Sequence, residues 1–303
     1  MRTFFGSLQR VAAVHVLCLG VWAASVQELQ GQGAAPQAVA ALQELAAKPV
    51  PVLPPIPSSE GQAKLLDAVR GYALNYTGSL PDFICLEETR RYVDSEGQQA
   101  WRLMDVLTAR LSYFDRKEDY KLVSQNGRAA KDASYESAGG ALSMGDFGTI
   151  MRDIFDPASH TSFAWEKWTT LRGRPTQVFS YRVPLPLYTI AYQGERYDGV
   201  QKAKVAYRGS VFVDKEFHTI VRITHEALNI PPSFPVREAT ETLDYDFIRI
   251  GEGRFFLPLA NDLQMHIRTY NGGLWTKNEK AFRLYRKFSA GATIKFDAQE
   301  LPQ

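Results

Sequence analysis

Residues 207–224 read YRGSVFVDKEFHTIVRIT, and this stretch decides the fold. Apolar and polar residues alternate on both sides of the segment Asp214-Lys-Glu216, which is typical of two strands that bury one face of a sheet. The segment between them has the length of a short hairpin loop. The stretch therefore predicts an antiparallel β-hairpin.

The same alternation recurs along most of the chain. Short turns between consecutive runs favour an antiparallel meander, and a sheet of about ten or eleven strands must curl or close. We therefore predict a mainly β (α+β) fold, either a half-open antiparallel β-barrel or a strongly curled sheet, with two covering helices. The expected strands lie near residues 84–93, 101–113, 119–124, 162–171, 176–184, 187–195, 201–213, 218–228, 238–250, 254–270 and 277–288.

Two segments have the helical period instead. The first begins with the capping-box pattern Ser59-Glu-Gly-Gln62 and runs to about Tyr76. The second runs from Ser143, its predicted N-cap, to Asp156, where Pro157 stops it. Its apolar stripe is expected to face the sheet, either as permanent core or as a lid over a ligand cavity. The stripe consists of Phe147, Ile150, Met151, Ile154 and Phe155.

The N-terminus carries the pattern of an export signal. Arg2 and Arg10 precede a short apolar run, and small residues near Ala24 offer a cleavage site, so residues 1–26 are predicted to be a secretory signal peptide. The run is shorter than the roughly 20 apolar residues of a spanning helix, so no stable transmembrane span is expected after cleavage. The protein is therefore expected to be periplasmic or secreted.

Behind the signal, we predict a linker and one domain. Residues 27–58 form an Ala/Gln-rich segment that ends in a Pro-rich, stiff spacer, and residues 59–303 form a single β-rich domain. Cys18 lies in the signal, and the residues before it do not resemble a lipoprotein signal, so lipidation is not expected. Cys85 is then the one remaining cysteine, and no internal disulfide is possible.

No residue pattern points to catalysis, a metal or a cofactor. His218 and His225 are seven residues apart in one predicted strand, which places them on opposite faces and argues against a metal site. Asp244 and Asp246 share one face, opposite Tyr245 and its apolar neighbours, and are expected to face solvent instead of forming an acid/base pair.

The remaining charges and the thiol have structural interpretations. Glu87 and Glu88 with Arg90 and Arg91 are expected to pair across strands. Cys85 is expected to be a buried, inert thiol. The chain has 35 basic and 33 acidic residues and no dense basic block, which argues against nucleic acid as a partner.

The order of export signal, helix, antiparallel strands, inserted helix and further strands resembles the periplasmic lipoprotein-carrier superfamily, the LolA, LolB and LppX type. The hairpin 207–224 is the most similar patch, and the strand Thr242-Leu-Asp-Tyr-Asp-Phe247 and the run Phe255-Phe-Leu-Pro258 are similar to the strands that follow it in that family. The resemblance spans about residues 60–290. It implies a half-open barrel with helices as a lid and an apolar cavity for acyl chains.

These observations predict an exported, non-enzymatic carrier or binder of a hydrophobic ligand, a lipid or the acyl chains of a lipoprotein. The alternative is a protein–protein interaction module of the cell envelope with a self-filled core and no ligand. A hydrolase ranks third, because no catalytic pattern supports it.

Overall fold

The computed structural model describes most of the predicted domain. All described residues lie in the compact unit Pro51–Gln303. The predicted signal peptide, the Ala/Gln-rich segment and the predicted N-cap Ser143 lie outside the described residues. Those residues are 54–130, 135–142, 147–194, 199–270 and 272–288.

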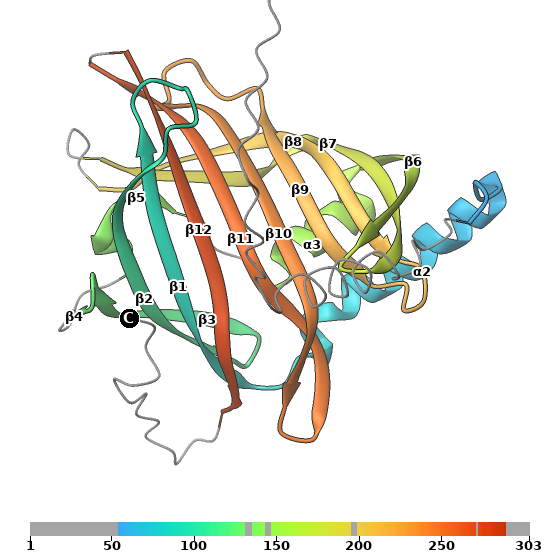
Figure 1. Ribbon diagram of the computed structural model, residues 1–303. Coiled ribbons are helices and arrows are strands. Elements are labelled where there is room, and N and C mark those ends of the chain that lie inside the picture. Colours follow the sequence, from blue (N-terminus) through green and yellow to red (C-terminus); the bar gives the residue numbers. More distant parts are fainter. Residues whose placement is uncertain (1–53, 131–134, 143–146, 195–198, 271, 289–303) are drawn as a thin grey trace, which may run out of the picture. The chain divides into compact units, whose positions relative to one another are not determined.

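The described strands form one antiparallel sheet that is not closed, as predicted, and it has twelve strands instead of the ten or eleven expected. In order they are β4, β3, β2, β1, β12, β11, β10, β9, β8, β7 and β5, with β6 paired to β7. Figure 1 shows the sheet curling, and β1 lies beside β12 although the two come from opposite ends of the domain. The strands are β1 Phe83–Asp94, β2 Arg102–Phe114, β3 Lys117–Gln125, β4 Arg128–Ala129, β5 Gly140–Leu142, β6 Ser162–Leu171, β7 Arg174–Gln193, β8 Gln201–Asp214, β9 Ile220–Leu228, β10 Val236–Ile250, β11 Gly253–Thr269 and β12 Gly272–Lys287.

The two strands predicted over 176–184 and 187–195 are one strand, β7. Proline lacks the donor that a strand ladder needs, but Pro184 and Pro186 lie where the pairing with β8 shifts, between Val183 and Tyr188. The chain remains extended through this irregularity because no ladder bond is required there. The prediction of a break was wrong for this reason.

The helix α2 spans Ser59–Ser79, close to the predicted helix. Its N-cap is Ser58, not Ser59: the Ser58 hydroxyl accepts from the Gly61 amide, and the Gln62 side chain donates to the Pro57 carbonyl. The cap therefore lies one residue earlier than the capping-box pattern indicated. Leu65, Val69, Ala73 and Tyr76 are its buried residues.

The helix α3 is shorter than predicted. It spans Thr149–Phe155 and begins after Gly148, whose φ of 112° is in the left-handed region that favours glycine. Asp156 ends it and caps a short 3-10 turn at Pro157–Ser159. Figure 1 shows α3 on one side of the sheet at β9 and β10.

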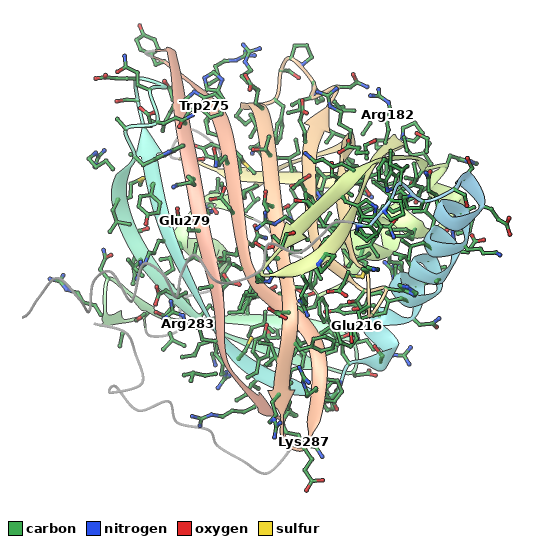
Figure 2. All side chains as sticks on the ribbon, turned by 45° about the vertical axis from the view of Figure 1, so that its right-hand side comes forward. Arg182, Glu216, Trp275, Glu279, Arg283 and Lys287 are labelled. Carbon is green, nitrogen blue, oxygen red and sulfur yellow. The ribbon has the colours of Figure 1, made fainter. Side chains whose placement is uncertain are left out.

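Side chains alternate between the two faces of each strand. On β12, Asn278, Lys280 and Phe282 are buried, whereas Glu279 and Arg283 are partly exposed. Figure 2 shows Trp275, Glu279, Arg283 and Lys287 spaced along the length of β12. We call the face of Asn278, Lys280 and Phe282 the inner face, and the helices pack on it.

Candidate functional site

The five residues predicted for the inserted helix are all buried, at 7% exposure or less. Four of them, Ile150, Met151, Ile154 and Phe155, pack with the buried residues of α2 against the inner face of β7 to β11. Phe147 precedes the helix and belongs to a separate cluster with Phe83, Tyr113 and Phe282. The structure therefore divides the predicted stripe between two apolar clusters.

The start of α3 lies directly against α2. A Cβ atom on Gly148 would lie 2.6 Å from Cδ1 of Tyr76 and 2.8 Å from Cγ2 of Thr77, so no other residue fits without movement. The Tyr76 hydroxyl in turn donates to the Phe256 carbonyl on β11 at 2.8 Å. Glycine at 148 thus sets both the backbone turn and the close packing of the two helices.

A shallow opening lies where α2 ends. A depression of about 500 Å³ is lined by Gly78, Leu80, Asp82, Tyr113, Phe114, Asp115 and Arg116. Tyr113 connects it to the interior, because its ring stacks on Phe83 at 5.2 Å and lies 6.1 Å from Phe147. Leu80 packs against both apolar clusters. A ligand that enters here would meet the predicted lid residues.

A row of buried polar side chains crosses the inner face of five neighbouring strands. The row consists of Glu87 on β1, Lys280 on β12, Asn261 on β11, Glu241 on β10 and His225 on β9, each exposed by 3% or less. Asn261 lies opposite Lys280, and Glu241 lies opposite His225. We call this row the polar belt.

At one end of the polar belt, Glu241 accepts from three side chains. Its Oε2 atom lies 3.0 Å from Nε2 of His225 and accepts from the Tyr188 hydroxyl at 2.8 Å. Its Oε1 atom accepts from the Asn261 amide at 2.7 Å. A buried carboxylate with several donors costs much less than an isolated one, which explains how Glu241 is tolerated in the core.

Gly209 leaves room for the ring of Tyr181 beside His225, at the β9 end of the polar belt. It lies between Tyr181 and His225 across the strands β7, β8 and β9, and a Cβ on it would lie 1.7 Å from the Thr224 carbonyl oxygen. The Tyr181 hydroxyl donates to that carbonyl at 2.9 Å and lies 3.2 Å from Nδ1 of His225. Burial, with the nearby Tyr207 and Glu241, raises the pKa of Tyr181, which therefore keeps its proton.

At the other end, Glu87 is held by two hydroxyls and a lysine. Its Oε1 atom accepts from Tyr135 at 2.7 Å and from Thr89 at 2.9 Å. The Nζ atom of Lys280 lies 3.8 Å from Oε2. Burial and the charge of Glu87 raise the pKa of Tyr135, so this phenol stays a donor.

Tyr135 belongs to a segment that crosses the inner face. This segment, residues 135–142, begins as a 3-10 turn and ends as β5, which pairs with β7; we call it the strap. Tyr135 packs with Ala109 on β2 and Ala191 on β7, so the strap lies between the two arms of the curled sheet.

Arg91 binds the middle of the strap. Its Nη1 atom donates to the carbonyls of Ala138 at 3.0 Å and Gly139 at 2.5 Å. Asp105 accepts from its Nε and Nη2 atoms and also from the Gln125 amide. Burial by itself raises the pKa of Asp105, but the bonds from Arg91 and Gln125 and the Arg91 charge outweigh it and hold the pKa below its ordinary value.

The structure corrects the interpretation of the histidines. His218 is not in a strand but in the turn before β9, with a φ of 50°, so the argument from opposite strand faces does not apply. His225 lies in the core and is bonded to Glu241. Among the described residues, no group of three or more His, Cys, Asp or Glu side chains has the arrangement of a metal site.

The two aspartates on β10 lie opposite the buried face and are paired with arginines. Asp244 accepts two hydrogen bonds from Arg222 at 2.8 Å each and one from Arg172 at 3.1 Å. Asp246 lies 3.2 Å from both Arg172 and Arg174. Carboxylates with this many cationic donors are structural charge pairs and not an acid/base couple.

The four charges on β1 divide between the faces. Glu88 on the outer face pairs with Arg90, two residues along the same strand, and with Arg283 on β12. Arg91 pairs across to Asp105 on β2, and Glu87 lies 3.8 Å from Lys280 across on β12, so both pair across strands as predicted. The burial of the Glu87–Lys280 pair in the interior was not predicted.

Cys85 lies on the inner face of β1. It is fully buried, and burial together with nearby Glu87 raises its pKa well above the ordinary value, so the thiol is protonated. Within the described part of the chain, no helix combines the length and the apolar character that crossing a membrane would need.

Comparisons with known proteins give structures but no sequence relatives. No protein-family model matches the chain, and no curated protein matches it. A DUF1329 family protein from Desulfovibrio piger is 8% identical and has a TM-score of 0.35, with 75% of this chain and 95% of that chain covered.

Two further solved structures are similar over a comparable part of the chain. A putative outer membrane lipoprotein-sorting protein domain from Vibrio parahaemolyticus is 10% identical, covers 75% of this chain and 92% of its own, and has a TM-score of 0.30. A LolA superfamily protein from Nitrosomonas europaea is 9% identical, covers 74% and 94%, and has a TM-score of 0.28.

Proposed function

We propose that this protein is an exported, non-enzymatic binder or carrier of a hydrophobic ligand, a lipid or the acyl chains of a lipoprotein. The ligand binds on the inner face of the sheet beneath α2 and α3. Phe147, Ile150, Met151, Ile154 and Phe155 form the movable wall of this site.

The observation that carries the proposal is the position of the two helices on an apolar inner face whose sheet is not closed. Apolar side chains of α2 and α3 belong to one cluster with apolar side chains of the strands, and apolar contacts have no directional requirement. A helix held in this way can separate from the sheet when another apolar molecule replaces those contacts. The depression beside Tyr113 is a route to this surface.

The polar belt supports an amphiphile over a pure hydrocarbon. The apolar cluster beneath the helices includes Ile223 and Leu243, which lie two residues from His225 and Glu241 on the same faces of β9 and β10. A chain bound against that cluster would thus have its polar end within reach of hydrogen-bonding side chains. Lipids have this division between a long apolar part and a small polar part.

The test compares ligand uptake with folding. Variants Phe147→Ala and Ile150→Ala remove apolar contacts at the start of α3, and Arg152→Ala, at a side chain that is 53% exposed, is the matched control on the same helix. Each is titrated with an environment-sensitive fluorescent fatty acid, and its melting temperature is measured. We expect saturable uptake by the wild type and the control and weaker uptake by both apolar variants while they remain folded.

Absence of uptake by the wild type, together with a loss of about 2 to 5 kcal/mol of stability in both apolar variants, would contradict the proposal, because it would make α3 permanent core. Mass spectrometry of protein purified from its native envelope is an independent test. A stoichiometric lipid supports the carrier.

The alternative function is an envelope protein–protein interaction module with a self-filled core. The packing of Phe83, Tyr113, Phe147 and Phe282 favours it, since these rings fill part of the inner face by themselves. Purified protein without lipid, and without fatty-acid uptake, would favour this module.

Export is part of the proposal and has its own test. The mature protein is expected to begin between about residues 24 and 36, with no lipid on Cys18. N-terminal sequencing of the protein from the native envelope measures this directly, and retention of residue 1 would exclude cleavage.

A further inference from the structure

Several described contacts of the strap are made by its backbone. Arg91 donates to two of its carbonyls, and the Asn278 amide donates to a third, that of Ala141, at 2.8 Å. Three backbone pairs join it to β7: Gly140 with Gln193, Ala141 with Tyr192 and Leu142 with Ala191. Backbone groups are common to every peptide, so these contacts select an extended chain and not a particular side chain.

Gly139 and Gly140 adopt a backbone conformation in which two strap carbonyls accept from Arg91. Gly139 and Gly140 have φ angles of 65° and 84°, and a Cβ on Gly140 would lie 3.1 Å from Nη1 of Arg91. A residue with a side chain would be strained in this conformation and would crowd the guanidinium. The Arg91 site is therefore shaped around a backbone that approaches closely.

Two of the strap side chains that the structure describes also contact the interior. Tyr135 and Ala141 are buried, and the Tyr135 hydroxyl bonds to Glu87. The backbone contacts of the strap to β7, Arg91 and Asn278 are ones that a second extended peptide could make.

We propose that the inner face around Arg91 and Asn278, together with the edge of β7 at residues 191–193, is a docking site for an extended peptide of a partner protein, which the strap occupies in this structure. The peptide adds to β7 as a strand in place of β5, and its carbonyls accept from Arg91 and Asn278. This inference does not depend on the hydrophobic ligand proposed above.

The charges of the site favour a peptide over an anionic headgroup. Arg91 is neutralised by Asp105, to which it donates two hydrogen bonds, and Lys280 lies beside Glu87. Because each cation has a carboxylate as its neighbour, the site has no excess positive charge to attract an anionic headgroup. Neutral peptide carbonyls need only hydrogen-bond donors, which Arg91 and Asn278 supply.

The experiment measures binding of a fluorescent synthetic peptide with the strap sequence YESAGGAL, residues 135–142, to the full chain by anisotropy. The variant Gly140→Val strains the strap, and Gly251→Val is its control, a glycine with φ of 60° in the β10–β11 turn with nothing within 4 Å. We expect Gly140→Val to bind the peptide about tenfold or more tightly than the wild type, since its site is more often vacated, and Gly251→Val to match the wild type.

Two further variants assign the binding to this site. Adding Asn278→Ala to Gly140→Val should weaken binding about tenfold, because one donor to the peptide is lost. A disulfide between Ala141→Cys and Tyr192→Cys, which are opposite each other in the β5–β7 pair, should prevent peptide binding until reductant is added. Reduction restores the same polypeptide, so misfolding cannot explain the change.

Four outcomes would overturn the proposal, and the first three concern peptide binding. They are no saturable binding by folded Gly140→Val, binding that is unchanged in the locked form, and equal binding of a control peptide with proline in place of the residue that corresponds to Ala141. Faster uptake of the fluorescent fatty acid by Gly140→Val without peptide binding would also overturn it, and would make the strap a gate for the lipid site.

Discussion

In the interior of the sheet, Nε2 of His225 lies 3.0 Å from Oε2 of Glu241, and the two side chains are 0% and 1% exposed. The residues are directly opposite each other on β9 and β10. Two polar groups at the centre of an apolar core are tolerated because each satisfies the other. Removal of Glu241 takes away an acceptor that His225, Tyr188 and Asn261 share.

Glu241→Ala should therefore destabilise the fold by about 3 to 5 kcal/mol. Glu226→Ala on the neighbouring strand is the control: Glu226 also accepts two bonds, from Arg208, but the side chains of this pair are 46% and 55% exposed, so the loss should be under about 1 kcal/mol. Urea unfolding of the two variants measures both values. Equal losses in the free energy of unfolding would show that the polar belt contributes no more stability than an exposed ion pair.

The Asp105 carboxyl should make stability depend on pH. Its folded-state pKa lies below its unfolded value of about 3.9, so its stabilisation is fully present above that pH and is lost as the pH falls through the folded-state pKa. Wild type should exceed Asp105→Asn in unfolding free energy at about pH 6, and the difference should shrink towards about pH 2.5.

The control for this prediction is Asp67→Asn, which removes a surface pair with Arg70 whose carboxylate is 73% exposed. Its effect on stability should be small at every pH. A difference between wild type and Asp105→Asn that grows on acidification would refute the assigned sign.

Gly209 and Gly71 should respond oppositely to alanine. A Cβ at 209 would lie 1.7 Å from the Thr224 carbonyl oxygen, so Gly209→Ala must shift a strand and should cost about 1 to 3 kcal/mol or more. Gly71 is in the interior of α2 with nothing within 4 Å, so Gly71→Ala should stabilise by about 0.5 to 1 kcal/mol. Thermal melts compare the two, and a neutral Gly209→Ala would mean that the strands there separate easily.

Two truncations test where the linker ends. Deleting residues 27–53 should leave the melting temperature nearly unchanged, as expected for a spacer. Deleting 27–58 removes the Ser58 cap and the Pro55 carbonyl that accepts from Trp168, which should cost about 1 kcal/mol or a few degrees. A clear fall with the shorter deletion would show that the linker packs on the domain.

The class of the fold and most of its strands could be predicted from local sequence patterns. Alternation such as that of 207–224 depends only on which face of a strand is buried, and the helical period of Ile150 and Ile154 depends only on neighbours along the chain. Burial of the polar belt is also indicated by local sequence. Glu241 lies on the same strand face as Leu243 and Tyr245, and His225 lies on the same face as Ile223. This alternation predicts that Glu241 and His225 are buried, but it does not predict which residues they contact.

Only the tertiary structure decided which distant residues meet. Tyr135 bonds to Glu87 at a separation of 48 residues, and Arg91 reaches Gly139 at the same separation. These contacts depend on the pairing of β1 with β12 and on the curl of the sheet, which brings β2 and β7 to either side of the strap. Strand pairing and the curl of the sheet result from packing over the whole sheet, between residues that are distant in sequence. A local sequence pattern therefore does not predict them.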